Sequence, residues 1–151
     1  MFKKVFMQDN FLNKTDCKKL IDFYKSKPLP EVFYQTYPMP LENNKLIKKI
    51  NKLSLSMYNC VIDWCQIVKW PSSHPGKKLH LDKVEGGTPP SLSSIIYLND
   101  NYKGGNTCFE DGTTFAPVAG RIILFDGDYY KHGVSSVQGE DRYTIASWFK
   151  I

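Results

Sequence analysis

Two of the three histidines in this chain of 151 residues stand where they could bind a metal ion together with a carboxylate. His80 is followed two positions later by Asp82, and residues two apart on a strand point to the same side. His132 lies fifty residues after Asp82, near the start of another expected strand. Two histidines and one carboxylate form a facial triad that leaves three neighbouring positions of an octahedral metal open. This arrangement suits non-haem Fe(II) that activates O₂.

Taken alone, each of these motifs also fits ordinary polar residues that bind no metal. Their order favours the metal site, because Arg142 follows His132 by ten residues and is one of only two arginines. A guanidinium in that place can hold a ligand carboxylate through paired hydrogen bonds. The other arginine, Arg121, begins an expected strand and is interpreted as structural. His74 lies in a loop that contains Pro and Gly and is interpreted as a surface residue.

The elements that must position these residues are short strands from Cys60 onward. We expect them over 61–69, 78–81, 91–98, 106–109, 113–116, 121–125, 132–137 and 142–149. Turns rich in Gly, Pro, Asn and Asp separate them, which is typical of antiparallel strands. Roughly eight such strands suit a double-sheet jelly roll. We therefore expect a mainly β fold.

Residues 1–59 are expected to form a helical layer packed on one sheet. A short edge strand at 4–7 precedes a first helix, which Asn13 or Thr15 caps and which ends near Lys25. A Pro-rich loop then leads to a second helix. That helix is expected over 41–58, with a core-facing stripe of Leu46, Ile50, Leu53 and Met57. The chain is thus expected to be a single domain, 1–151, in which 60–151 form the β core.

Composition excludes several classes of protein. Hydrophobic residues make up 42% and charged residues 23%, so the chain is not disordered as a whole, and no apolar run is long enough for a membrane-spanning helix. With no secretory signal and four cysteines without a CxxC pair, reduced thiols and a cytoplasmic location are expected. The net charge of +5 comes from 1–59, which carry 11 basic and 5 acidic side chains. Nearly all of the basic residues are lysines, which makes nucleic acid an unlikely partner.

The order of several segments resembles the iron(II)- and 2-oxoglutarate-dependent oxygenases, and among them the prolyl 4-hydroxylase-like branch. The segments are HLD, YLND, GGNTCFED, VAGRIILFDGD, the histidine at 132 and RYTIASWF, with a weaker match at NFLNKTDCKKLIDFY. The resemblance covers about 60–151. It implies a double-stranded β-helix, which is a jelly-roll barrel with the metal at its open mouth.

The resemblance also implies a role for each matching residue. His80, Asp82 and His132 match the metal ligands. Arg142 matches the residue that pairs with the far carboxylate of 2-oxoglutarate, and further contacts to the co-substrate or the pocket are expected from Tyr97, Thr144 and Trp70. Trp70 departs from the family, because many members have a tyrosine there. Thr107 is expected at the mouth, and the loop at 83–91 is either a lid or a plain connector.

The function implied by the resemblance is hydroxylation of a C–H bond, in a prolyl or other side chain of a protein or peptide. Fe(II), 2-oxoglutarate and O₂ would be required, 2-oxoglutarate would be decarboxylated to succinate, and ascorbate is a candidate cofactor. One alternative is the same chemistry on a small metabolite, a free amino acid or a nucleic-acid base. Another is a cupin-like metal-binding module without oxygenase activity. The sequence leaves the oligomeric state open.

Overall fold

The computed structural model describes residues 5–28, 35–82 and 92–151, and strands dominate their secondary structure. The two helices are α1 (Lys14–Lys25) and α2 (Lys45–Tyr58). The described strands are β1 (Phe6–Gln8), β2 (Gln35–Pro38), β3 (Val61–Trp70), β4 (Lys77–His80), β5 (Leu92–Tyr97), β6 (Lys103–Gly104), β7 (Thr107–Phe109), β8 (Thr114–Phe115), β9 (Ile122–Asp126), β10 (His132–Val134), β11 (Val137–Gln138) and β12 (Arg142–Lys150). Within these residues no helix is long and apolar enough to cross a bilayer.

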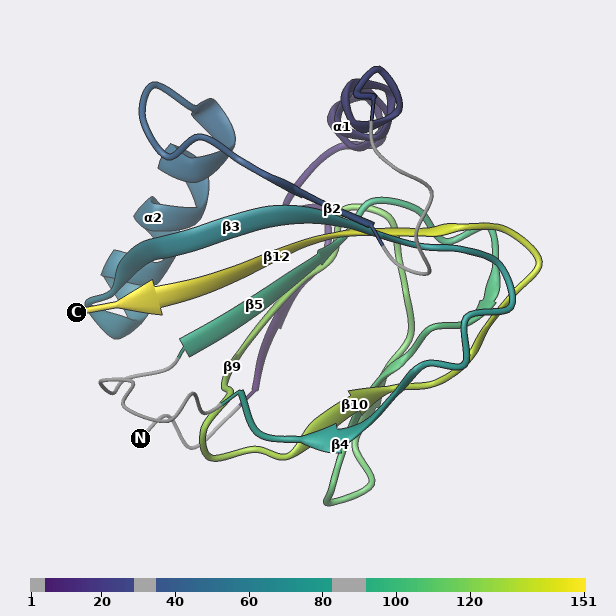
Figure 1. Ribbon diagram of the computed structural model, residues 1–151. Helices are drawn as coiled ribbons and strands as arrows, with labels where there is room; N and C mark the ends of the chain where they lie inside the picture. The colour runs from purple at the N-terminus through teal and green to yellow at the C-terminus, as the bar shows by residue number, and fades with distance from the viewer. Residues whose placement is uncertain (1–4, 29–34, 83–91) are drawn as a thin grey trace.

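Two antiparallel sheets build the β core. The larger has six strands in the order β1-β9-β5-β12-β3-β2, and the smaller has four in the order β4-β10-β7-β8. A separate pair joins β11 to β6. Figure 1 shows β4 and β10 facing β3, β12 and β5, with α1 and α2 on the outer side of the larger sheet. The predicted jelly roll with two helices on one sheet is confirmed.

The two faces of the larger sheet have different chemistry because side chains alternate along each strand. Ile67, Ile145 and Ile96 are paired across β3, β12 and β5, and each is fully buried. They belong to the same hydrophobic cluster as Ile47 and Ile50 of α2. Burial of each such side chain stabilises the fold by roughly 1.5–3 kcal/mol. The other face of these strands looks toward the smaller sheet and is left for the functional site.

Asparagine side chains begin both helices. Asn13 accepts a hydrogen bond from the backbone N–H of Asp16 at 2.7 Å, so the first of the two predicted caps is the one used. Asn44 accepts from the backbone N–H groups of Leu46 and Ile47. These bonds satisfy amides that have no partner inside the helix, and α2 therefore starts at Lys45, later than expected.

The predicted core-facing stripe of the second helix is wrong at Met57, which is 44% exposed. The buried face of α2 instead includes Ile47 and Ser54. The Ser54 hydroxyl donates to the carbonyl of Cys60 at 2.8 Å and ties the helix to the start of β3. Asn59 then reverses the chain with a φ of 54°. The last turn of α2 therefore lies at the edge of the core, where Met57 meets solvent.

Two strands form where the sequence predicted loops. β2 lies in the Pro-rich segment and pairs with β3 as the last strand of the sheet. An edge strand tolerates Pro38, because one side of its backbone needs no partner in the sheet. β6 pairs with β11, and the single strand expected over 132–137 is divided into β10 and β11.

Candidate active site

The three predicted metal ligands come together where the antiparallel strands β4 and β10 pair. His80 ends β4 and His132 begins β10, and the two residues lie opposite each other in this antiparallel pair. Oδ1 of Asp82 lies 3.3 Å from Nε2 of His80 and 3.2 Å from Nε2 of His132. One ligand atom of each residue lies within 4.8 Å of the others. Such a cluster is compact enough for the three residues to share one ion.

Backbone carbonyls fix the orientation of both imidazoles. Nδ1 of His80 is 2.8 Å from the carbonyl oxygen of Lys78, and Nδ1 of His132 is 2.8 Å from that of Tyr130. Because a carbonyl only accepts, each Nδ1 carries the proton in the neutral ring. Each Nε2 then has a free lone pair on the side of Asp82, which is the orientation that metal-binding histidines have.

The carboxylate of Asp82 is held by its other oxygen. Oδ2 accepts from the hydroxyl of Ser93 at 2.7 Å and from the indole N–H of Trp148 at 3.3 Å. Burial raises the pKa of Asp82, but when the histidines are protonated, a hydrogen bond from His132, one from Ser93 and the positive charges of the imidazoles outweigh it and lower the pKa to about 2. Burial lowers the pKa of His80. An ionised carboxylate and a neutral imidazole are the forms that bind metal.

Arg142 is the second feature of the site, and no carboxylate of the described residues forms an ion pair with it. The side chain is only 3% exposed and its Nε donates to the carbonyl of Gly105 at 3.1 Å. Its Nη2 is buried and has no hydrogen-bond partner among the described residues. The guanidinium carbon lies 5.0 Å from the ring centre of Trp70 and 5.6 Å from that of Tyr97. A buried charge without a partner is costly, so this position fits an anionic ligand.

One cavity of about 490 Å³ joins the triad to Arg142. Its walls come from β4 and β10 on one side and from the inner face of the larger sheet on the other. Trp70 and Thr144 line it, as does Trp148 near the end of β12. Tyr97 does not line it. Its hydroxyl instead meets that of Thr107, so the expected contact between Tyr97 and a co-substrate stays a prediction.

Comparison with known proteins decides the family of this chain. The model of the 2OG-Fe(II) oxygenase superfamily matches residues 65–150. The chain belongs to this superfamily. No curated protein sequence matches the chain. The oxygenase fold recurs in solved structures at low sequence identity, and prolyl hydroxylases are among them.

One such structure is the viral collagen prolyl hydroxylase of Paramecium Bursaria Chlorella virus-1 in its 2OG complex, with a TM-score of 0.77 at 18% identity, covering 97% of this chain and 95% of that one. Another is a prolyl-4-hydroxylase of Pseudomonas putida, with a TM-score of 0.73 at 18% identity and coverage of 97% and 91%. The third is a prolyl hydroxylase of Trichoplax adhaerens in complex with a hypoxia inducible factor peptide fragment, with a TM-score of 0.72 at 20% identity and coverage of 96% and 82%. At these identities the likeness establishes a shared fold.

The residues of this oxygenase fit the cofactors of its family, Fe(II) and 2-oxoglutarate. Two imidazole nitrogens and one carboxylate oxygen are the donor set of non-haem iron oxygenases. Arg142 lines the same cavity, and its buried Nη2, which has no partner among the described residues, suits the far carboxylate of a dicarboxylic acid. The enzyme is thus an Fe(II)/2-oxoglutarate-dependent dioxygenase, and the cupin-like alternative without oxygenase activity is set aside.

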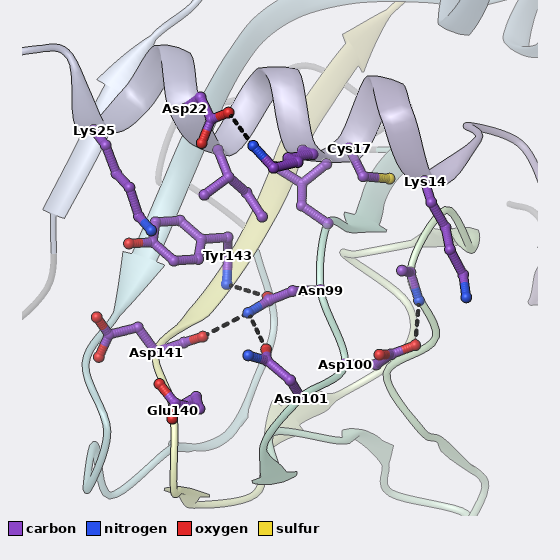
Figure 2. A pocket seen from close by; sticks show the side chains of 14 residues that line it. Lys14, Cys17, Asp22, Lys25, Asn99, Asp100, Asn101, Glu140, Asp141 and Tyr143 are labelled. Carbon is purple, nitrogen blue, oxygen red and sulfur yellow. Dashed lines mark hydrogen bonds and ion pairs between the residues drawn. The ribbon is translucent and has the colours of Figure 1, made fainter.

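Asn99 positions Arg142 in this oxygenase, which the sequence did not indicate. Its side-chain amide donates to the carbonyl oxygen of Asp141 at 2.8 Å, and its side-chain oxygen accepts from the N–H of Tyr143 at 2.9 Å. These are the two peptide groups on either side of Arg142. Figure 2 shows both bonds, together with a third from Asn99 to Asn101, at the bottom of a pocket beside α1. Asn99 therefore fixes the backbone from which the guanidinium extends.

The structure corrects the expected position of His74, which the sequence analysis placed on the surface. The side chain is only 5% exposed, lines the cavity and stacks on Trp70 with ring centres 4.0 Å apart. Burial lowers the pKa of His74, and the charge of Arg142 lowers it further. The three residues between Trp70 and His74 form a turn that starts at Pro71, and no periodic signal reveals that such a turn folds back on the indole.

Three other expectations have different outcomes. Thr107 is fully buried, so its expected place at the mouth is wrong. Arg121 binds both carboxylate oxygens of Asp9, at 2.6 and 3.2 Å, which agrees with a structural role. The loop at 83–91 lies outside the described residues.

Proposed function

We propose that this oxygenase hydroxylates a C–H bond in a prolyl or other side chain of a protein or peptide and decarboxylates 2-oxoglutarate to succinate. The observation that carries the proposal is one cavity that has both the triad and Arg142 in its wall, where Nη2 of Arg142 lacks a partner among the described residues. The fold that it shares with three prolyl hydroxylases supports a prolyl substrate, and one of those is in complex with a peptide.

Each part of the cavity has a task in this reaction. His80, Asp82 and His132 would hold the iron, and the hydrogen bonds to Lys78, Tyr130 and Ser93 keep their donor atoms aimed at one point. When bound, the iron supplies the oxidation chemistry with O₂ and 2-oxoglutarate.

The co-substrate would be held at the other end of the cavity. Arg142 would pair with the far carboxylate of 2-oxoglutarate, and Thr144 stands beside it on the same face of β12. The indole of Trp70 covers the guanidinium and reduces its contact with water. A desolvated guanidinium binds a carboxylate more strongly than an exposed one does, because water no longer screens the pair.

The test is an assay of coupled turnover. Iron-loaded protein with 2-oxoglutarate and O₂ is offered proline-containing peptides, and both succinate and the gain of one oxygen atom in the peptide are measured by mass spectrometry. We expect equal amounts of succinate and hydroxylated peptide, and neither product with His132→Ala. Hydroxylation of free amino acids or nucleobases, with all peptides inert, would contradict the peptide substrate while leaving the oxygenase chemistry intact.

A cytoplasmic location belongs to the same proposal. All four cysteines are free, and three of them are buried. Burial raises the pKa values of Cys17, Cys60 and Cys65, which keeps these thiols protonated and unreactive. Free cysteines of this kind suit a reducing compartment. The nature of the partners beyond the substrate, and ascorbate as a cofactor, stay predictions.

A further inference from the structure

An irregularity in β4 places an exposed lysine, Lys77, in the wall of the active-site cavity. His132 pairs with His80 and Val134 pairs with Lys77, so two steps along β10 correspond to three along β4. The extra residue is a β-bulge, and a bulge shifts which side chains share a face. Lys77 therefore lies on the same face as His80 and lines the cavity. In a regular strand Lys78 would share that face instead.

The bulge is built into the packing of the two strands. A Cβ placed on Gly133 would come within 2.5 Å of the carbonyl oxygen of Lys77 and 3.0 Å of the backbone nitrogen of Leu79. Only a glycine at position 133 permits so close an approach of β10 to the bulged segment. Bulges beside active sites commonly redirect a side chain toward them, and here the redirected side chain is cationic.

Lys77 has no counter-ion among the described residues that line the cavity. Among the described lining residues, the charged side chains other than histidine are Lys77, Asp82 and Arg142. The charges of Fe(II) and Arg142 are balanced by Asp82 together with the two carboxylates of 2-oxoglutarate. Lys77 is the cation that remains, and no described carboxylate forms an ion pair with it. The loaded site thus has an excess of positive charge on the side of β4.

We propose that Lys77 selects an anionic substrate and pairs with a carboxylate carried next to the position that is hydroxylated. This inference rests on the proposed function and narrows it to peptides with an acidic residue beside the target. The net charge of +5 attracts anions in general, so the role of Lys77 has to be separated from it by a variant that removes an equal charge elsewhere.

The experiment compares two capped peptides, acetyl-Ala-Glu-Pro-Glu-Ala-amide and its twin with Gln in place of both Glu residues. Binding is measured by calorimetry to protein loaded with Mn(II) and N-oxalylglycine, which replace iron and 2-oxoglutarate and allow no turnover. Succinate formation by the iron-loaded enzyme is measured in parallel. The variants are Lys77→Gln and Lys77→Glu, and Lys78→Gln is the matched control because Lys78 is the neighbouring lysine but does not line the cavity.

We expect the acidic peptide to bind about fivefold more tightly than its twin to the unchanged protein and to Lys78→Gln, as a partly exposed ion pair would give. The preference should disappear in Lys77→Gln and reverse in Lys77→Glu. Equal affinity for both peptides in the unchanged protein, or a preference that survives in Lys77→Gln, would overturn the role of Lys77.

A second pair of probes separates this inference from the proposed function. If neither peptide binds, the peptide substrate is wrong, and the same variants are tested with L-proline against L-prolinamide. A preference for the free acid that requires Lys77 would support the inference without a peptide substrate. No binding of any acid would overturn both. Binding of the acidic peptide without hydroxylation would contradict the proposed function alone.

Discussion

Replacing Arg142 by methionine should weaken 2-oxoglutarate binding and at the same time leave the free protein as stable as before, or more so. Methionine fills a similar volume against the rings of Trp70 and Tyr97, which lie 5.0 and 5.6 Å from the guanidinium carbon. It removes the positive charge and the unpartnered Nη2. Affinity and stability are therefore expected to change in different directions, which a general loss of packing could not produce.

The magnitudes follow from burial. Arg142 is 3% exposed, and truncation of one partner of a buried charge pair costs about 2–5 kcal/mol of binding free energy. The dissociation constant for 2-oxoglutarate should thus rise at least about thirtyfold. In the free protein the same charge is buried without a carboxylate, and an apolar replacement of a buried charge is often neutral or stabilising by about 1–4 kcal/mol. Loss of the bond from Nε to Gly105 reduces that gain.

The assay combines calorimetry with urea unfolding. Titration of 2-oxoglutarate into Mn(II)-loaded protein gives the affinity, and unfolding of the metal-free protein gives the stability. Arg142→Lys serves as a control that keeps the charge but loses the planar fork, and its affinity should lie between the other two. An affinity of Arg142→Met within threefold of the original would refute the co-substrate role. A large loss of stability would show that Arg142 acts through packing.

Three more predictions concern the residues that support this site. Ser93→Ala removes the 2.7 Å hydrogen bond to Oδ2 of Asp82, so the affinity for Co(II) should fall about tenfold. The visible spectrum of bound Co(II) measures this affinity, and an unchanged value would contradict the positioning of the carboxylate by Ser93. Asn99→Ala removes the hydrogen bonds to both peptide groups beside Arg142, so the affinity for 2-oxoglutarate should fall about tenfold while the affinity for metal is unchanged. An equal loss of both affinities would point to a general distortion. His74 has a pKa below its usual value, so the unfolded chain takes up its proton first as the pH falls. The unfolding free energy of the metal-free protein should then decrease below about pH 6.5, and less so in His74→Gln, whereas identical pH profiles would refute the burial argument.

Much of the fold follows from local signals in the sequence. The β-rich segment 61–69, which turn residues bound, predicts a strand, and β3 covers it. Asn13 predicts the start of α1 because its side chain can accept from an unpaired backbone amide. Edge strands such as β2 carry weaker signals, since one side of the backbone has no partner and Pro38 is tolerated there. The single-domain organisation stays a prediction.

The candidate site was predictable as far as its chemistry depends on residue type and order. The spacing of His80 and Asp82, with His132 at the start of a later strand, is enough to suggest a shared ion. The contacts that support Asp82 and Arg142 could not be predicted, because they join residues far apart in the sequence. Asn99 reaches the backbone beside Arg142 only after β5 and β12 have paired.

The sequence also did not predict that Lys77 lines the cavity, and the reason is a local irregularity in β4. Simple alternation along β4 places Lys78, not Lys77, on the side of His80. The bulge that reverses this is detectable only in the register between β4 and β10. A sequence pattern assumes regular strands, so it is least accurate where a strand is interrupted, and active sites are frequent places for such interruptions.

The central claim is that His80, Asp82 and His132 hold Fe(II) in the cavity where Arg142 receives 2-oxoglutarate. The most direct test is an anaerobic titration of the metal-free protein with Fe(II) and then 2-oxoglutarate, followed through the visible charge-transfer band that arises when a keto acid chelates iron. The band should appear at one equivalent of iron, be absent from His132→Ala, and require more 2-oxoglutarate in Arg142→Met. Iron binding without any band, or an unchanged band in His132→Ala, would contradict the account.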